Sequence, residues 1–195
     1  MSPFLVVIAG GTASGKSTAA SRAAEQLGAL LISHDRYYLD VEEPRGHNYD
    51  HPDALDTSRL VADLQGLLAG RPTGLPVYDF PTHRRQAHAE VVEPSEIILV
   101  EGILTLADRR VAELAALSVY VDAPDDIRLA RRIRRDVVSR GRSVEGVLDQ
   151  YLATVRPMHN QFVAPCAGVA DLVLSGIAPI EQVVGQLVAA VRARV

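Results

Sequence analysis

A chain of 195 residues is long enough to bury a sizeable core, and we expect one domain over residues 1–195. The formal net charge of −4 argues against a general nucleic-acid-binding protein, because such proteins carry a strong basic excess. The single cysteine, Cys166, excludes an internal disulfide, and the apolar stretch at residues 4–9 is too short to cross a bilayer. We therefore expect a cytoplasmic protein with no membrane partner.

Short apolar runs predict strands that are buried on both faces, as in a parallel sheet, at residues 4–9, 29–33, 96–102, 117–122 and 171–175. Helical spacing is found at residues 16–27, 57–69, 105–115, 125–138, 144–157 and 180–193. This alternation predicts an α/β fold with a central parallel sheet flanked by helices. Asp56 or Thr57 is a plausible N-cap for the helix at 57–69. Residues 72–95 break the alternation and predict a β-hairpin inserted before the third strand.

The stretch GGTASGKST, residues 10–18, contains Lys16, the only lysine beside nineteen arginines. Its spacing fits the phosphate-binding loop G-x-x-x-x-G-K-[ST], which follows a strand and opens a helix. Glycines let main-chain N–H groups approach phosphate oxygens, and a compact ammonium fits between two phosphates better than a forked guanidinium. The predicted nucleotide-binding residues are Gly10, Gly11, Thr12, Ala13, Ser14, Gly15, Lys16, Ser17 and Thr18.

Magnesium ligands are the next requirement, since this metal bridges the phosphates of the donor. Ser17 supplies a hydroxyl, while Asp35 and Glu101 follow apolar strands at the sheet edge where parallel sheets bind ligands. We expect these three residues to form the Mg²⁺ site. Zinc is not expected, because the histidines show no ligand spacing.

Seven arginines lie between residues 128 and 142, and Arg128, Arg132 and Arg135 share one helical face. We interpret Arg132, Arg135, Arg140 and Arg142 as part of a helical lid, about residues 125–160, that closes on the transferring phosphate. We interpret the remaining arginines as a solvated charged face with Asp125, Asp126 and Asp136 as partners; these arginines are Arg128, Arg131 and Arg134. A nucleic-acid patch is a third interpretation, weakened by the acidic net charge and the lack of nearby aromatic residues.

Several stretches together resemble the uridine/cytidine kinase family of phosphate-loop kinases. They occur in the family's order and cover nearly the whole chain: GGTASGKST, ISHDRYY, NYDHPDALD (48–56), PVYDFPTHRR (76–85), ILVEGIL (98–104) and the segment 121–162. The resemblance implies a fold like that of the nucleoside monophosphate kinases and transfer of the γ-phosphate of ATP or GTP to the 5′-hydroxyl of uridine or cytidine. It also implies feedback inhibition by CTP or UTP and a homotetramer.

The resemblance also implies roles for individual residues. Asp35 would be the catalytic base beside Lys16, with Arg135 and Arg140 as the lid residues that meet the phosphates. Asp50 would bind the ribose together with Arg132, and His83 would face the substituent at position 4 of the pyrimidine. A neutral imidazole can donate or accept a hydrogen bond, which favours use of both nucleosides. The expected substrate-binding residues are Tyr38, Asp50, Tyr78, Phe80, His83, Arg132, Arg142 and Gln150.

Some positions depart from the family pattern. His34 and Arg36 flank Asp35, where Gln and Ser are common, and Arg36 could alter the pKa of Asp35 or the path of the phosphate. The connection from Tyr38 to Asn48 is shorter than usual, and the loop SGIAPI after the last strand leaves the choice between ATP and GTP open.

Two other functions remain open from the sequence. A related phosphate-loop kinase could act on a pantothenate- or ribulose-phosphate-type substrate. A nucleotide-dependent RNA-binding regulator could use the arginine row.

Overall fold

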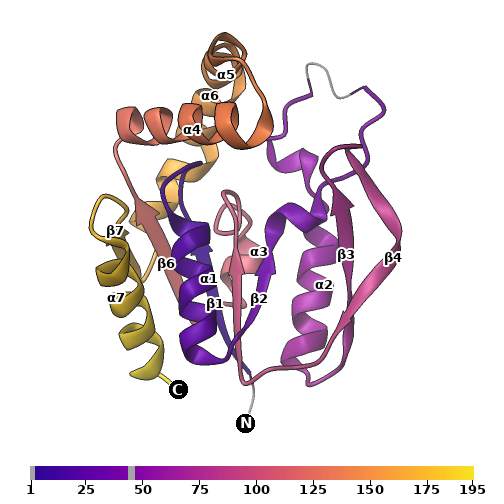
Figure 1. The fold of residues 1–195 in the computed structure, drawn as a ribbon. Helices are drawn as coiled ribbons and strands as arrows, with labels where there is room; N and C mark the ends of the chain where they lie inside the picture. Colours follow the sequence, from indigo (N-terminus) through magenta and orange to yellow (C-terminus); the bar gives the residue numbers. More distant parts are fainter. Residues whose placement is uncertain (1–2, 44–46) are drawn as a thin grey trace.

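The computed structural model describes residues 3–43 and 47–195. Part of the shortened connection between Tyr38 and Asn48 therefore lies outside the described residues. A five-stranded sheet forms the centre, and its strands are β1 (Phe4–Ala9), β2 (Leu30–Ser33), β5 (Ile97–Glu101), β6 (Leu117–Asp122) and β7 (Leu172–Ser175). Their order is β2-β5-β1-β6-β7, and every neighbouring pair is parallel, so the predicted parallel sheet is confirmed (Figure 1).

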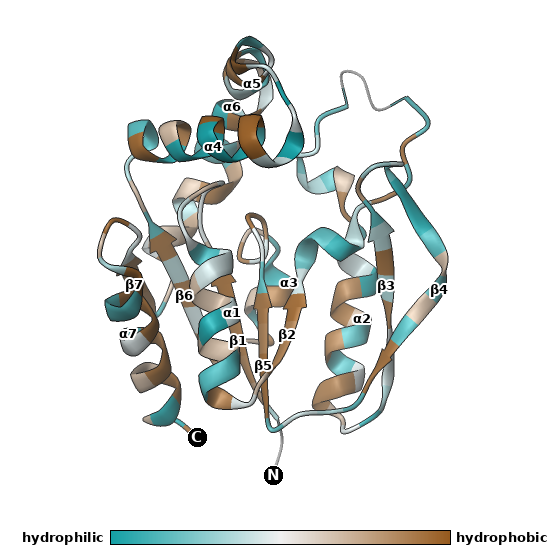
Figure 2. Ribbon diagram, in the orientation of Figure 1, coloured by the Kyte–Doolittle hydropathy of each residue, from teal (hydrophilic) through white to brown (hydrophobic). Residues whose placement is uncertain are grey.

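Helices on both faces explain why the central strands read as unbroken apolar runs. Val6 and Ile8 of β1 face a core built with α1 (Lys16–Leu27) and α7 (Ile180–Arg192). Leu5 and Val7 point to the opposite core, which contains α2 (Thr57–Leu68) and α3 (Arg109–Ala112). Figure 2 shows hydrophobic residues along the central strands, as expected for a sheet covered on both sides.

The local start signals explain where two of these helices begin. Asp56 caps α2, because its carboxylate accepts a hydrogen bond of 3.0 Å from the main-chain N–H of Arg59. The helix predicted over 105–115 is wrong in its extent: only the single turn of α3 forms, starting after the cap residue Asp108. The hydroxyl of Thr105 instead donates to the main-chain oxygens of Ile8 and Gly102. These bonds hold residues 103–107, before α3, in a series of turns.

The predicted hairpin is present as β3 (Thr73–Asp79) and β4 (Arg84–Val92). The two strands pair antiparallel, with a register shift between Pro76 and Tyr78, and form a separate two-stranded sheet. The 3₁₀ turn His34–Tyr37, which follows β2, contacts β3, and a second 3₁₀ turn lies at Pro52–Ala54. In Figure 1 the hairpin stands next to α2, at one side of the main sheet.

Helices cross above the carboxyl edge of the sheet, where the lid is predicted (Figure 1). They are α4 (Asp125–Arg140) and α5 (Val144–Gln150), followed by π-helical turns at Tyr151–Val155 and His159–Val163 around the short α6 (Arg156–Met158) and by a 3₁₀ turn at Ala164–Gly168. The helix predicted over 144–157 is therefore interrupted by wider turns. Pro157 lies within this segment, and because proline has no N–H the regular hydrogen-bond ladder cannot continue there. None of the helices in the described ranges is long and apolar enough to span a membrane.

Candidate active site

The loop between β1 and α1 has the backbone conformation that its glycines allow. Gly10 and Gly15 have φ angles of 148° and 99°, and Ala13 also lies in the left-handed region at 59°. A Cβ atom at Gly10 would lie 2.5 Å from the main-chain oxygen of Val121, so the loop could not keep this close approach with a larger residue. The glycines are needed both for the turn and for packing against β6.

In the described part of the chain, no side chain caps the N-terminus of α1. Gly15 is the N-cap and provides no side-chain acceptor. Oriented N–H groups at a helix N-terminus attract phosphate oxygens, which agrees with the predicted phosphate loop. Lys16, the first residue of the helix, is only 8% exposed, and its Nζ lies 3.9 Å from Oε2 of Glu101.

Carboxylates from two strand ends meet this loop. The hydroxyl of Ser17 donates a 2.9 Å hydrogen bond to Oε2 of Glu101, at the end of β5. Asp35 follows the neighbouring strand β2, and desolvation raises its pKa, with the positive charge of Lys16 opposing the shift and Glu101 adding to it. The structure thus brings the three predicted metal-binding residues to one edge of the sheet.

Both neighbours of Asp35 turn away from the cleft. His34 is 1% exposed, and burial lowers its pKa to about 4, so at neutral pH it adds no charge beside Asp35. The side chain of His34 packs against Gly102, where only glycine leaves enough space. A Cβ atom at position 102 would lie 2.5 Å from the Cβ atom of His34. Arg36 reaches the hairpin, where its Nε donates to the main-chain oxygen of Pro76 at 2.9 Å and its guanidinium pairs with Glu90. The expectation that Arg36 could act on Asp35 or on the phosphate is therefore not supported by its position.

A buried network fixes the 3₁₀ turn that carries Asp35. The hydroxyl of Tyr37 donates to Asp63 of α2 at 3.1 Å, and burial raises the pKa of this tyrosine well above its usual value. Arg59 donates to the other oxygen of Asp63 at 2.8 Å and to the main-chain oxygen of Gly74 in β3 at 2.8 Å. The turn, α2 and the hairpin are thus joined by charge-assisted hydrogen bonds.

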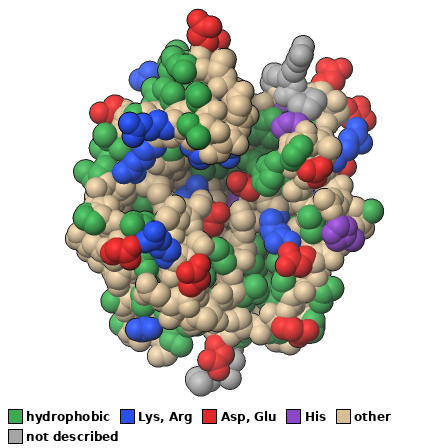
Figure 3. Space-filling model, in the orientation of Figure 1, with side chains coloured by type: hydrophobic (Ala, Val, Ile, Leu, Met, Phe, Trp, Pro, Cys, Tyr) green, Lys and Arg blue, Asp and Glu red, His purple; other side chains and the backbone are tan. Residues whose placement is uncertain are grey.

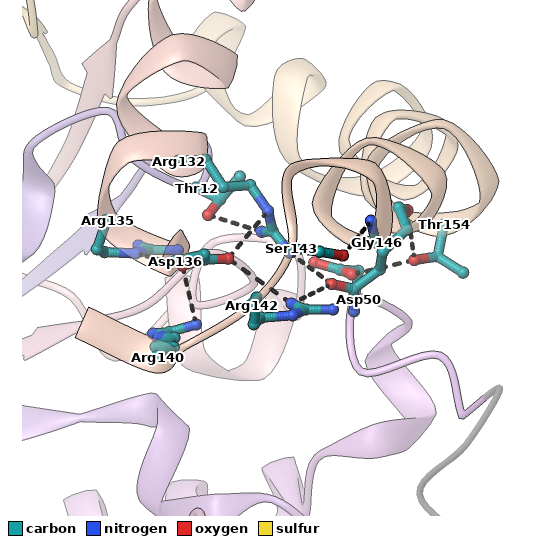
Figure 4. A network of polar contacts seen from close by, with 11 residues as sticks. Thr12, Asp50, Arg132, Arg135, Asp136, Arg140, Arg142, Ser143, Gly146 and Thr154 are labelled. Atoms are coloured by element: carbon teal, nitrogen blue, oxygen red, sulfur yellow. Dashed lines mark hydrogen bonds and ion pairs between the residues drawn. The ribbon is translucent and has the colours of Figure 1, made fainter. Parts of the chain in front are cut away.

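The lid arginines surround a single carboxylate (Figure 4). Asp136 is fully buried, and its oxygens lie 2.8 Å from Arg135, 3.4 Å from Arg140, 3.6 Å from Arg132 and 3.7 Å from Arg142. Among the ion pairs of the described residues it is the only carboxylate partner of these arginines. The cluster therefore keeps a net positive charge, and Arg135 and Arg140 also lower the pKa of Asp35 through their charges.

Arg132 connects this cluster to Thr12 of the phosphate loop and to Gln150 of α5. It donates to the hydroxyl of Thr12 at 3.1 Å and to the side-chain oxygen of Gln150 at 2.9 Å, and that oxygen also accepts a 2.7 Å bond from Arg142. Desolvation raises the pKa of Asp50, while Arg132 and a weak hydrogen bond of 3.5 Å from Thr154 lower it. A small pocket between Thr12 and Asp50 is lined further by residues of the lid segment.

Aromatic side chains gather between Asp50 and the hairpin. The ring of Tyr38 lies 5.7 Å from Tyr49 and 5.6 Å from Tyr78, and Phe80 lies 5.2 Å from Tyr78. Phe80 remains 54% exposed although it is a large apolar side chain. His83 contacts Tyr49 in the same group. Figure 3 shows the surface hollowed between the lid and the sheet edge, with acidic and basic side chains inside the hollow.

Comparison with known proteins agrees with this arrangement. Residues 5–181 match the model of the phosphoribulokinase/uridine kinase family. A protein named uridine kinase from Chloroflexus aurantiacus is 45% identical over 204 residues, covering 98% of this chain and 97% of the relative. Another with the same name, from Halobacterium salinarum, is 46% identical over 178 residues, covering 88% and 79%.

This chain belongs to the phosphoribulokinase/uridine kinase family. It is a kinase with the phosphate-loop fold of that family. Among solved structures, phosphoribulokinase from Rhodobacter spheroides superposes with a TM-score of 0.69 at 14% identity, covering 89% of this chain and 70% of that one. Shikimate kinase from Acinetobacter baumannii gives a TM-score of 0.54 at 14% identity, covering 98% and 94%. At these identities the structures support the fold alone.

The family implies a nucleotide phosphate donor with Mg²⁺, and the residues fit such a metal. Ser17, Asp35 and Glu101 offer only oxygen atoms, which Mg²⁺ prefers. No cluster of three or more His, Cys, Asp or Glu side chains suited to a metal is found in the described ranges. Mg²⁺ is usually bound by one or two carboxylates, while phosphate oxygens and water complete its coordination.

One prediction about the arginine row of this family member was wrong. Arg128 is not solvated: it is 1% exposed, its Nε donates to the main-chain oxygen of Ala123 at 3.0 Å, and it pairs with Asp125. Its guanidinium packs behind the phosphate loop, because a Cβ on Gly11 would lie 2.5 Å from one of its nitrogens. Arg131 does lie at the surface, where it donates to the main-chain oxygen of Gly176 in the loop after β7 at 2.8 Å.

Sequence reasoning named Asp136 only as a surface partner and did not single out Arg85. Arg85 extends from the hairpin to the main-chain oxygens of Tyr37 and Tyr38, at 2.8 and 2.9 Å, and to Asp56 at 3.0 Å. An available signal for Asp136 was its place among the arginines, since one acid within a basic row is its natural counter-ion. Nothing local identified the partners of Arg85, which lie at least 29 residues away along the chain.

Proposed function

We propose that this kinase transfers the γ-phosphate of ATP or GTP to the 5′-hydroxyl of uridine or cytidine. The observation that carries the proposal is the position of Asp35. The charges of Lys16 and Glu101 on the donor side, and those of the lid arginines, all act on the pKa of its carboxyl group. Relatives named uridine kinase at 45 to 46% identity support the nucleoside as acceptor.

The donor is held by the phosphate loop in this proposal. Main-chain N–H groups at the start of α1 bind its phosphate oxygens, and Lys16 adds a compact positive charge. Mg²⁺ held by Ser17, Asp35 and Glu101 would supply neutralisation of phosphate charge. The choice between ATP and GTP stays open.

Asp35 serves as the base that orients the 5′-hydroxyl and accepts its proton. A carboxylate with its pKa raised by burial holds a proton more readily than one in water, which favours transfer from the hydroxyl. Arg135 and Arg140 then stabilise the negative charge that spreads over the transferring phosphoryl group. Both side chains remain partly exposed, at 38% and 56%, and so stay available to an incoming phosphate.

The nucleoside would lie between Asp50 and the hairpin. Asp50 accepts hydrogen bonds from the ribose hydroxyls, next to Arg132. Phe80 and Tyr78 pack on the pyrimidine, and His83 faces its substituent at position 4, with Tyr38, Arg142 and Gln150 completing the site. The exposure of the Phe80 ring leaves its face accessible for stacking with a planar ligand. Feedback inhibition by CTP or UTP and a tetrameric state remain predictions from the family resemblance.

The test is release of ADP with uridine, cytidine, thymidine, pantothenate, ribulose 5-phosphate or no acceptor. We expect turnover that depends on uridine or cytidine and that Lys16→Ala abolishes. Turnover with pantothenate or the sugar phosphate alone would assign a different acceptor. RNA binding that falls steeply with salt, without nucleoside-dependent turnover, would contradict a nucleoside kinase altogether.

A further inference from the structure

A tyrosine that the proposed reaction does not use touches the base-reading histidine. The hydroxyl oxygen of Tyr49 lies 2.8 Å from Nδ1 of His83, and the two rings are stacked with centroids 5.2 Å apart. The two residues are separated by 34 positions, so this contact joins the segment that carries Asp50 to the hairpin.

The orientation of Tyr49 is fixed by its other neighbours. The ring of Tyr38 meets it edge-on at 5.7 Å, and that of His47 does so at 4.6 Å. Desolvation raises the pKa of the Tyr49 hydroxyl, so the phenol keeps its proton across the physiological range. The hydroxyl is therefore a fixed group with one proton to donate.

The backbone at His83 is also held in an unfavourable conformation. Its φ angle is 55°, in the left-handed region that glycine and asparagine adopt more readily. A residue other than glycine keeps this conformation where its surroundings hold it. Here the main-chain oxygen of His83 accepts a 3.2 Å bond from the N–H of Val41, and the side chain is held by Tyr49.

A neutral imidazole has one nitrogen that donates and one that accepts, so a bond to one nitrogen determines the character of the other. A phenol hydroxyl donates readily to the lone pair of an imidazole nitrogen. With Tyr49 donating to Nδ1, the ring proton of His83 must be on Nε2. No partner for Nε2 is found among residues 3–43 and 47–195, which leaves it available to a ligand.

We propose that Tyr49 sets the tautomer of His83 and thereby makes the site prefer uridine to cytidine. The inference rests on the proposed function, in which His83 faces position 4 of the pyrimidine. An Nε2–H group donates to the 4-oxo group of uridine but meets the N–H donors of the 4-amino group of cytidine. A buried pair of donors without an acceptor is unfavourable, so the two substrates differ in transition-state binding.

The first experiment measures kcat/KM for uridine, cytidine and the riboside that has hydrogen at position 4. We expect uridine to exceed cytidine by about tenfold or more, the effect of one well-placed hydrogen bond. Tyr49→Phe removes the hydroxyl and keeps the ring, and should reduce the ratio of uridine to cytidine by about tenfold. The riboside without a substituent at position 4 should change by less than about twofold. Tyr120→Phe, on β6, is the matched control that keeps the wild-type ratio.

The second experiment does not depend on turnover. ¹⁵N NMR of histidine-labelled protein, with the His83 signals assigned through His83→Asn, should show a protonated Nε2 and an unprotonated Nδ1 in the wild type. Tyr49→Phe should shift these signals towards a mixture of tautomers. In the His83→Asn background, Tyr49→Phe should leave the ratio of uridine to cytidine unchanged, because the pair is already broken.

A proton on Nδ1, a wild-type preference for cytidine, or an unchanged ratio in active Tyr49→Phe would each overturn the inference. If Tyr49→Phe does not fold, the wild-type ratio and the wild-type spectrum still decide. Absence of turnover with every pyrimidine nucleoside would instead contradict the proposed function and leave the spectrum as the test of the Tyr49–His83 bond.

Discussion

At the scale of single residues, the site depends on where two charges are placed. Lys16 is the only lysine in a chain that otherwise uses arginine, and it lies 3.9 Å from Glu101 at the start of α1. Asp35 stands at the end of the neighbouring strand, where burial raises its pKa and Lys16 opposes that shift. The protonation of Asp35 therefore depends on the charge of Lys16.

Asp35→Asn tests the base directly. The amide keeps the shape of the side chain but cannot accept the hydroxyl proton, so kcat should fall by about 10²-fold or more. The KM for ATP should change much less than kcat, because the phosphate loop and the other two proposed Mg²⁺ ligands, Ser17 and Glu101, are intact. Steady-state kinetics with saturating nucleoside measures both values. Asp53→Asn, whose side chain is 91% exposed, is the control. Near-normal turnover in the Asp35 variant would remove this residue from its proposed role.

At the scale of elements, charged side chains connect parts that the main sheet does not join. Arg85 of the hairpin donates to the segment that carries Asp35. Arg36 of that segment donates in turn to the hairpin. In the lid, Asp136 gathers the arginines of α4 and of the following turn. The hairpin, which is predicted to bind the nucleoside, and the predicted lid are thus each positioned by a few ionic contacts.

Arg85→Met should loosen the hairpin without touching the donor site. It removes charge-assisted bonds to two main-chain oxygens and to Asp56, each contributing about 1.5–3 kcal/mol when well made. We expect the KM for the nucleoside to rise by about tenfold while the KM for ATP stays within about twofold. Arg84→Met, at the neighbouring exposed position, should behave like the wild type in the same assay. An unchanged nucleoside KM in the Arg85 variant would show that the hairpin is held by other contacts.

Asp136→Asn should disorganise the lid. The substitution preserves volume but leaves the lid arginines without a carboxylate, and breaking a buried ion pair typically destabilises a protein by about 3–5 kcal/mol. We expect a lower Tm and a kcat reduced by about tenfold or more, measured below the Tm of the variant. Asp149→Asn, an exposed acid on α5, is the control for charge loss in the lid. A folded Asp136→Asn variant with normal kcat would show that the arginines need no counter-ion.

At the scale of the whole molecule, the core couples stability to pH. His34 is buried with its pKa lowered to about 4, and burial together with Arg128 lowers the pKa of His159 to about 4 as well. The unfolded chain binds a proton at such a histidine below about pH 6.5, whereas the folded chain stays neutral until about pH 4. The free energy of unfolding therefore falls as the pH decreases through this window.

His34→Gln should remove part of that pH dependence. The difference between 6.5 and about 4 corresponds to about 3 kcal/mol lost by the wild type on acidification because of His34 alone. Urea unfolding at pH 7, 5 and 4 measures the loss, which should be smaller by about this amount in His34→Gln. His88→Gln, at an exposed position of β4, should leave the pH profile unchanged. An equal loss in His34→Gln and wild type would mean that other groups cause the acid sensitivity.

The sequence by itself determined the features that depend on residues close together in the chain. An apolar run, glycines at set intervals and one lysine predict the phosphate loop, and Asp56 predicts the start of α2 because a cap acts on its own helix. The parallel sheet followed from strands that are apolar on both faces. Only the tertiary structure decided that Arg128 is buried, that Asp136 collects the lid arginines, and that Tyr49 meets His83. These outcomes depend on partners brought together by folding, and the charge of a side chain does not reveal which distant atoms will surround it.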